Sequence, residues 1–178
     1  MTNILNELSN NEYWLYNKAG NQLNHIGYTV KLFPDKKHLY DDYKSIHNEY
    51  LNVLEDSDDE TVKLEALKRL IFLNGYSALE PNYLTGIEEL DDKTIFNAYE
   101  ILNAYIKDGK LDQEFKWMLS YYSSWDFLIF HYSEDKLYEL TAFVKSVNTS
   151  IRCHPSKELR MKAMNNRGQM GIYWKSLN

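Results

Sequence analysis

The chain has 178 residues, 44% of them hydrophobic, and a formal net charge of −6. This length and apolar content suit one domain over residues 1–178 with its own core, and the single cysteine, Cys153, excludes an intramolecular disulfide. No segment approaches the roughly 20 apolar residues that a membrane-spanning helix needs, and no basic leader precedes an apolar run. We therefore expect a cytoplasmic protein that does not engage a membrane.

The charges are unevenly distributed along the chain. Residues 145–178 hold seven basic residues and one acid, whereas the preceding 144 residues hold 13 basic residues and 25 acids. The sequence thus predicts an acidic body and a basic C-terminal segment. Such a field influences the choice of partner and the rate of encounter more than it influences the fold.

The first predicted element is a helix over residues 11–33, where apolar residues recur at the spacing of one helix face. Pro34 would end it, because the residue before a proline is displaced from the helical conformation. The sequence NKAG at 17–20 leaves an alternative open, in which the first thirty residues form a β-hairpin of an α+β domain.

Further segments show the helical period or helix-terminating residues. In the first of them, Leu39, Tyr43, Ile46, Tyr50 and Val53 follow one another at steps of three and four. Asp91 or Asp92 and Ser156 are typical N-caps, and Gly109 is a typical stop. The predicted helices after the first cover residues 35–56, 61–74, 91–109, 112–132, 134–147 and 156–168.

Two connections stand out between these helices. Residues 55–60 form an acidic turn whose carboxylates favour the positive N-terminus of the following helix, and residues 75–90 contain Gly75, Pro81 and Gly86 and predict an unusually long connection. We expect an all-α fold of six or seven helices in consecutive antiparallel hairpins, arranged as an irregular bundle or in a solenoid-like manner.

Asp126 is the one charged residue between Met118 and Tyr132. Burial of such an acid would raise its pKa and make it a candidate for acid–base catalysis, so one hypothesis is a hydrolase that uses Asp126 and His131 with help from Tyr122 or Tyr132. A solvated or hydrogen-bonded structural role is the favoured interpretation, because a lone acid rarely indicates catalysis. No nucleophile elbow, phosphate-binding loop or dinucleotide fingerprint occurs.

Histidines provide the candidates for a metal site. His25, His47 and His131 fall on three separate predicted helices, and facing helices can assemble such a site. His38 and Asp42, four residues apart, offer two ligands without a third. Because no two histidines have the spacing of a ligand pair, we expect no metal and no cofactor, and interpret these histidines as structural or surface groups.

The C-terminal segment combines Arg160, Arg167 and Lys175 with Tyr173 and Trp174, a mixture of cations and flat rings that can track phosphates and stack on bases. Nucleic-acid binding through residues 145–178 is therefore a second alternative. Since the acidic body would repel a phosphate backbone, docking of this segment on the body is the favoured interpretation.

The leading functional hypothesis is a non-enzymatic protein whose acidic helical surface binds a basic protein partner, as an inhibitor or immunity protein would. It depends on the acidic body and on an aromatic content of 15%, because aromatic residues are enriched at interface hot spots. The candidate binding residues are Asp56, Asp58, Asp59, Glu60, Tyr122, Trp125, Arg160, Arg167 and Trp174.

Overall fold

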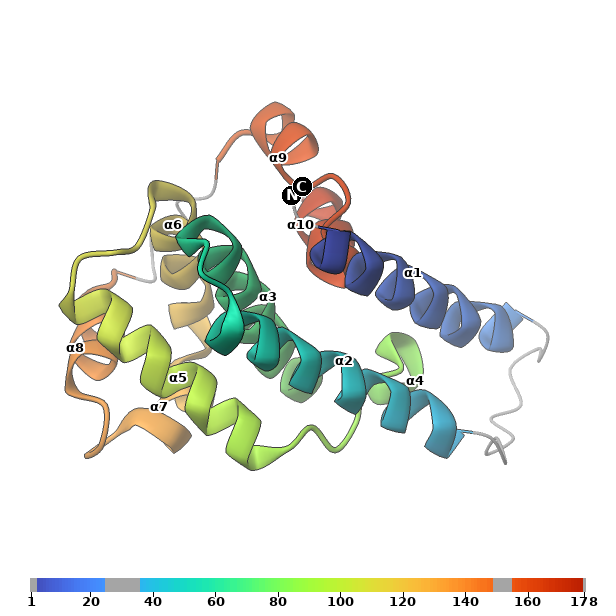
Figure 1. Cartoon of the computed structure of the whole chain (residues 1–178), viewed down its shortest axis with the longest axis horizontal. Helices are drawn as coiled ribbons and strands as arrows, with labels where there is room; N and C mark the ends of the chain where they lie inside the picture. The colour runs from blue at the N-terminus through green and yellow to red at the C-terminus, as the bar shows by residue number, and fades with distance from the viewer. Residues whose placement is uncertain (1–2, 25–35, 149–154, 178) are drawn as a thin grey trace.

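The computed structural model describes residues 3–24, 36–148 and 155–177, and all regular secondary structure among them is helical (Figure 1). The prediction of an all-α fold is confirmed for these residues. The described helices are α1 (Asn3–Asn24), α2 (Lys36–Asp56), α3 (Glu60–Leu79), α4 (Asn82–Thr85), α5 (Asp92–Lys107), α6 (Gln113–Tyr122), the 3-10 turn η1 (Ser123–Trp125), α7 (Asp126–Ser133), α8 (Tyr138–Ser146), α9 (Lys157–Ala163) and α10 (Gly168–Ser176).

Helix α1 replaces the β-hairpin that the sequence left open, so that alternative is wrong for the described part of this segment. Leu5, Leu8 and Leu15 are buried on one face of the helix, and this burial outweighs the poor helix propensity of the surrounding asparagines. The rest of the predicted helix, its end at Pro34 and the candidate ligand His25 lie outside the described residues.

Helices α2 and α3 make the most extensive helix–helix contact of the described fold. Their three-residue connection folds α3 back along α2, and Asp59 caps α3 by accepting hydrogen bonds from the backbone N–H groups of Thr61 and Val62. Helix α3 also contacts α5 and α10 and is buried around most of its circumference. It is therefore the central helix of the fold.

The connection after α3 is shorter than the sequence suggested. Helix α3 continues through Gly75 to Leu79, and the short helix α4 occupies part of the remainder. The prediction of an irregular connection over residues 75–90 is thus wrong in its first third, because burial of the α3 face outweighs the cost of a glycine in a helix. Helix α5 begins at the cap Asp91 and ends just before Gly109, as predicted.

The predicted single helix over residues 112–132 is broken into α6, η1 and α7. Trp125 leaves the helical conformation, with φ −118° and ψ 45°, and its ring packs edge-on against Tyr121 at 5.2 Å between centroids. One helix therefore ends at Tyr122 and the next begins at Asp126.

The C-terminal segment forms two helices where the sequence predicted one. Helix α9 starts at the predicted cap Ser156 but ends at Ala163, and α10 follows it. Helix α10 packs against α1, and α8 packs against α5, so helices distant in the sequence lie side by side and consecutive hairpins describe only part of the packing.

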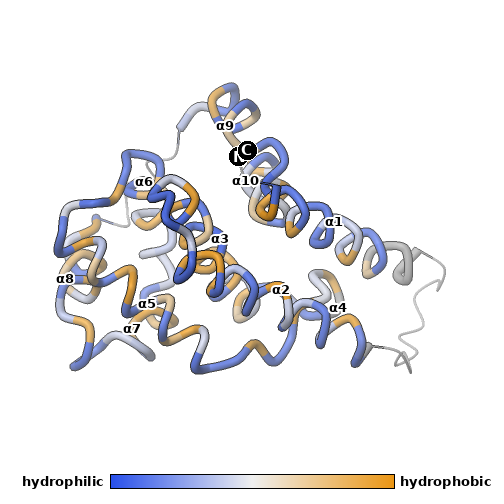
Figure 2. The backbone as a smooth tube through the Cα atoms, viewed as in Figure 1, coloured by the Kyte–Doolittle hydropathy of each residue, from blue (hydrophilic) through white to orange (hydrophobic). Residues whose placement is uncertain are grey.

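The buried apolar residues of these helices form one continuous cluster that extends from Leu5 in α1 to Trp174 in α10. Hydrophobic and hydrophilic residues alternate along the helices, as one buried and one exposed face requires (Figure 2). None of the described helices is long and apolar enough to cross a membrane.

Candidate functional site

The interior of the protein holds more positive than negative side chains. Among the described residues, four basic side chains are buried, and one acidic side chain, Glu12, is buried with them. The buried basic residues are Lys68, Arg69, Arg160 and Arg167. Their removal from the surface leaves the exposed side chains more acidic than the net charge of −6 implies.

Glu12 belongs to α1 and contacts α2 and α10. Its carboxylate accepts hydrogen bonds from Tyr50 Oη at 2.5 Å and from the backbone N–H of Gln169 at 2.9 Å. Arg69 donates to Tyr50 Oη at 3.0 Å and to Ser9 Oγ at 2.5 Å, so its charge is close by. Burial raises the pKa of Glu12 in spite of the hydrogen bond from Tyr50 and the charge of Arg69.

A second set of charges, in which Lys68 and Arg167 are buried and their carboxylate partners are half-buried or exposed, joins α3, α6 and the start of α10. Arg167 donates to both carboxylate oxygens of Glu65 and, at 2.8 Å, to Glu114, while Lys68 donates to Asp112 at 2.6 Å and to Glu114 at 2.8 Å. Burial alone would raise the pKa of Glu65, but the hydrogen bonds and charge of Arg167 outweigh it and hold the pKa below its ordinary value. Because each cation of this cluster is paired with carboxylates of the protein, we interpret the cluster as structural.

The predicted binding residues of the C-terminal segment are part of this interior. Arg160 donates to the backbone carbonyls of Pro155 at 3.1 Å and Leu177 at 2.6 Å, and Arg167 pairs with the body of the protein. Trp174 is fully buried and donates from Nε1 to Tyr122 Oη at 3.0 Å. These residues are therefore inaccessible to a protein or nucleic acid in this conformation, and for Arg167 docking on the body is confirmed.

Trp125 shares this aromatic environment but remains half-buried. Its ring stacks on Tyr122 with an interplanar angle of 22° and 6.1 Å between centroids. Trp117 and Tyr121 pack edge-on against Trp174. These contacts show that the aromatic residues in this part of the molecule serve the packing of the core.

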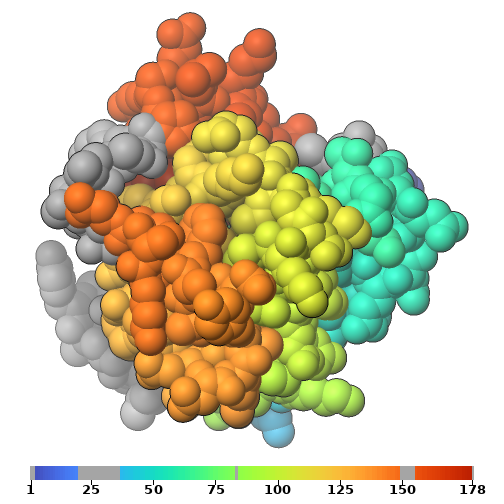
Figure 3. Space-filling view, turned by 90° about the vertical axis from the view of Figure 1, so that its left-hand side faces the viewer, coloured from blue at the N-terminus to red at the C-terminus, as the bar shows by residue number. Residues whose placement is uncertain are grey.

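The predicted acidic residues lie at the surface. Asp56, Asp58, Asp59 and Glu60 are all exposed. Two of them also have local structural roles, because Asp59 caps α3 and Glu60 accepts a hydrogen bond from Tyr105 Oη at 3.1 Å. In Figure 3 this corner, in turquoise, stands out beside α5 in yellow-green, so a large partner can reach it.

The acidic surface extends along α2. Asp41, Asp42, Glu49, Glu55 and Asp56 are exposed on this helix and lie at the spacings that place residues on one broad face. This acidic face, defined as these five residues together with Asp58, Asp59 and Glu60, contains the predicted acidic turn at its C-terminal end. The helical period of α2 could have identified the added residues, because its apolar positions leave them on the opposite side.

A groove with a cavity volume of about 320 Å³ lies beside the acidic face, between α1 and α2. Trp14 lies in its lining with 59% of its surface exposed, and the ammonium of Lys18 lies 4.8 Å from the centre of its ring. Asp42 and Glu49 line the same groove. Sequence reasoning missed Trp14, although a tryptophan on the polar side of an amphipathic helix is a signal for contact with a partner.

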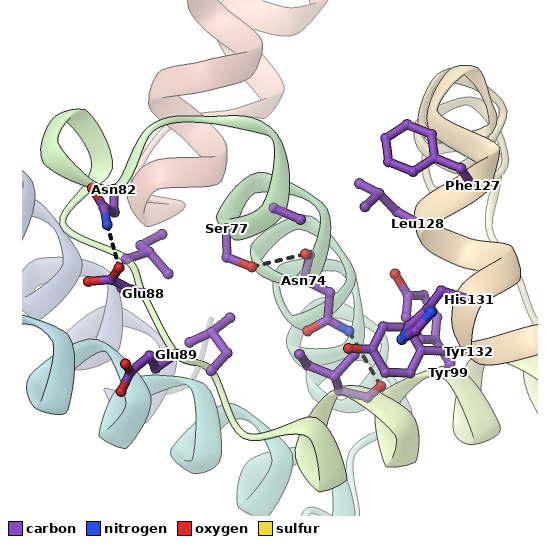
Figure 4. A pocket seen from close by; sticks show the side chains of 14 residues that line it. Asn74, Ser77, Asn82, Glu88, Glu89, Tyr99, Phe127, Leu128, His131 and Tyr132 are labelled. Carbon is purple, nitrogen blue, oxygen red and sulfur yellow. Dashed lines mark hydrogen bonds between the residues drawn. The ribbon is translucent and has the colours of Figure 1, made fainter.

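A larger pocket, of about 540 Å³, lies between the C-terminal part of α3, the connection from α4 to α5, and α7 (Figure 4). Glu88 and Glu89 stand on the connection, and Phe127, His131 and Tyr132 stand on α7. Tyr132 Oη donates to Asp92 at 3.0 Å. We call this cavity the α7 pocket.

The structure does not unite the residues of the hydrolase hypothesis. Asp126 is exposed and does not belong to the lining of the α7 pocket, whereas His131 does. Asp126 occupies the first turn of α7, where a negative charge stabilises the helix dipole. This location supports the structural interpretation of Asp126.

The histidines do not form a metal site in the described part of the chain, where no group of three or more potential ligands is close enough to hold an ion. His47 is fully buried and donates from Nε2 to Asn74 Oδ1 at 2.7 Å. Burial lowers the pKa of His47 to about 4. His38 and His131 are exposed on separate helices.

Three comparisons with known proteins complete the description of the site. No protein-family model, no curated protein and no solved structure matches this chain.

Proposed function

We propose that this protein binds a basic protein partner through the acidic face and the adjoining groove of Trp14. The observation that carries the proposal is the separation of charge between interior and surface: in the described part of the chain four basic side chains are buried, while the carboxylates of α2 and of the α2–α3 connection are exposed. An exposed field of one sign attracts an oppositely charged protein and accelerates its encounter.

The groove supplies the apolar contact that charge alone does not provide. Leu15 and Ile46, both buried, line the groove together with the exposed ring of Trp14, and Asp42 and Glu49 line it too. Binding energy at interfaces is concentrated in aromatic anchors surrounded by polar groups. The partner would therefore present a basic segment with an apolar side chain, such as one on a toxin or enzyme that this protein neutralises in the manner of an inhibitor or immunity protein.

The test is affinity capture with quantitative mass spectrometry, using the wild-type protein and the variants D42K/E49K and Trp14→Ala as baits. We expect basic proteins that the wild type captures to be lost from both variants. In a binding titration with the captured partner, D42K/E49K should weaken the affinity by about tenfold or more at low salt, and the loss should shrink as salt screens the charges.

The matched control is E100K/E158K, which makes the same change of net charge at exposed positions on α5 and α9. It should retain the partner, because these glutamates lie outside the acidic face. Equal loss of the partner from both double variants would show that overall charge, and not this face, governs binding. Retention of all captured proteins by D42K/E49K would contradict the proposal.

A further inference from the structure

We propose that Lys18 is an internal competitor for the basic side chain that a partner places against the ring of Trp14. Lys18 follows Trp14 by one helical turn on α1, and its ammonium lies over that ring. The inference rests on the proposed function, because it concerns the same groove, and it adds a means of regulation: the ammonium of Lys18 must move away when a partner binds.

The ring of Trp14 takes no part in the packing of the core. Trp14 is 59% exposed, and it belongs neither to the buried apolar cluster nor to the half-buried residues that pack against that cluster. The ammonium of Lys18 lies 4.8 Å from the centre of the ring. An exposed tryptophan presents a large flat surface with an attraction for cations, which is a surface that suits contact with a partner.

Other lysines of the described chain lie over rings in a different setting. Their ammonium groups are 5.4 or 5.5 Å from the ring centres, and each ring is buried or packs against the core. The stems of these lysines therefore cover the edge of the core. These pairs are Lys110 with Tyr105, Lys136 with Phe96, and Lys145 with Phe130. Lys18 instead covers a ring that the core does not use.

The contact between Lys18 and Trp14 is weak enough to be exchanged. None of the ion pairs among the described residues includes Lys18, so no carboxylate holds its ammonium in place. A cation over an exposed ring is favoured only about two- to fivefold over the same cation in water. A partner that offers a better-placed cation can therefore displace Lys18.

The groove beside the ring supplies what an incoming basic side chain needs. Asp42 and Glu49 line the groove, and its lining contains no lysine or arginine. Leu15 and Ile46 offer contact to the aliphatic stem of such a side chain. A cation that enters the groove approaches the ring that Lys18 already covers, and two cations at one ring repel each other. Lys18 therefore weakens the binding of a basic partner.

The experiment is a titration of the full chain with a capped tripeptide of alanine, arginine and leucine at pH 7 and low salt, followed by amide and indole NMR signals. We expect saturable shifts at the indole of Trp14 and at the amides of Ile46 and Glu49. The same peptide with citrulline, the neutral isostere of arginine, should give no saturable shift. Lys18→Met removes the charge and keeps an unbranched apolar stem, so it should tighten binding of the arginine peptide by about two- to fivefold.

Lys37→Met is the matched control, because it removes the same charge from an exposed position on α2 that does not line the groove. Solvent and salt screen such a charge, so this variant should change the affinity by less than Lys18→Met does. The methylene signals of Lys18 give a second measurement. The ring current of Trp14 shifts these signals in the free protein, and they should move toward unshifted positions as the arginine peptide binds. Amide spectra without peptide establish that both variants are folded.

Three results would overturn this inference: Lys18→Met binds the arginine peptide no tighter than Lys37→Met does, the citrulline peptide binds equally well, or no saturable shift occurs at Trp14. The proposed function survives any of them if a captured basic protein is still lost from D42K/E49K. Tighter peptide binding by Lys18→Met in the absence of any captured protein would support competition at the ring, and it would contradict only the claim that a protein partner supplies the cation.

Discussion

Individual side chains show how this protein keeps polar groups inside a helical core. Arg69 and Arg167 both pair with the carboxylate of Glu65. The carboxylate of Glu12 accepts one hydrogen bond from a phenol and one from a backbone N–H. Removing one partner from such a set leaves an uncompensated buried charge, which costs far more than loss of a surface ion pair. The strongest constraints on sequence at this scale are therefore the polar interior residues.

His47 provides a test of this description by pH. It donates from Nε2, and its Nδ1 has no hydrogen-bond partner among the described residues. Protonation would place an unsatisfied N–H group and a charge in the core, which explains why burial lowers the pKa of His47 to about 4. Because the unfolded chain binds a proton near pH 6.5 and the folded protein does not, stability must fall as pH decreases from about 6.5 to about 4, by about 1.4 kcal/mol per pH unit.

His47→Leu should remove this dependence. At pH 7.5 the variant should be less stable than the wild type by about 1–2 kcal/mol, because Asn74 loses a buried donor. As the pH falls toward 4, the difference should shrink and then reverse, since the linkage effect approaches about 3 kcal/mol. Urea unfolding of both proteins at several pH values measures this difference in the free energy of unfolding. A difference that stays constant between pH 7.5 and 4.5 would show that His47 is protonated in the folded protein.

At the scale of helices, the sequence predicted the elements whose buried faces are apolar and whose ends are capped. Helix α2 follows its period of Leu39, Tyr43, Ile46 and Tyr50, and α5 begins at Asp91. The sequence pattern did not predict α10, because the buried positions Gly168, Gln169 and Gly171 carry no hydrophobic signal. It also missed the break at Trp125, where contacts with rings on α6 compete with the continuous apolar pattern.

Two glycines on different helices test this packing with the same substitution. A Cβ at Gly171 would lie 2.4 Å from the carbonyl oxygen of Met164, whereas a Cβ at Gly75 would meet no atom within 4 Å. Gly171→Ala should therefore destabilise the protein by about 1–3 kcal/mol, because the backbone before α10 must move. Gly75→Ala should stabilise it by about 0.5–1 kcal/mol through helix propensity. Thermal unfolding followed by circular dichroism gives both values.

The pair serves as its own control, since each variant adds one methyl group to a helix. An increase in stability for Gly171→Ala would mean that α10 is not seated against the segment around Met164. A marked loss for Gly75→Ala would mean that α3 does not continue as a regular helix beyond Asn74.

At the scale of the whole molecule, the division into an acidic body and a basic tail describes the sequence and not the shape. The chain folds two arginines of the tail, Arg160 and Arg167, into the interior, whereas every described acidic residue except Glu12 remains at least partly exposed. The acidic turn of the candidate site was predicted, but the two cavities could not be, because each is formed by segments that only the fold brings together. The groove of Trp14 joins two helices, and the α7 pocket joins segments as distant in the sequence as Asn74 and Tyr132.

This arrangement makes the C-terminal segment part of the core, which a truncation can test. A chain that stops at residue 154 lacks Met170 and Trp174, both fully buried, and leaves Glu12 and Glu65 without their donors Gln169 and Arg167. The loss of this apolar burial, together with the loss of one donor from each carboxylate, costs more free energy than the typical stability of a domain of this size, about 5–15 kcal/mol. We expect the truncated chain to show no cooperative thermal transition and no near-ultraviolet circular dichroism from its tryptophans.

The full-length variant L159S/M161S, which changes exposed apolar residues of the same segment, should unfold as the wild type does. Cooperative unfolding of the truncated chain at the wild-type temperature would show instead that α9 and α10 form a detachable tail.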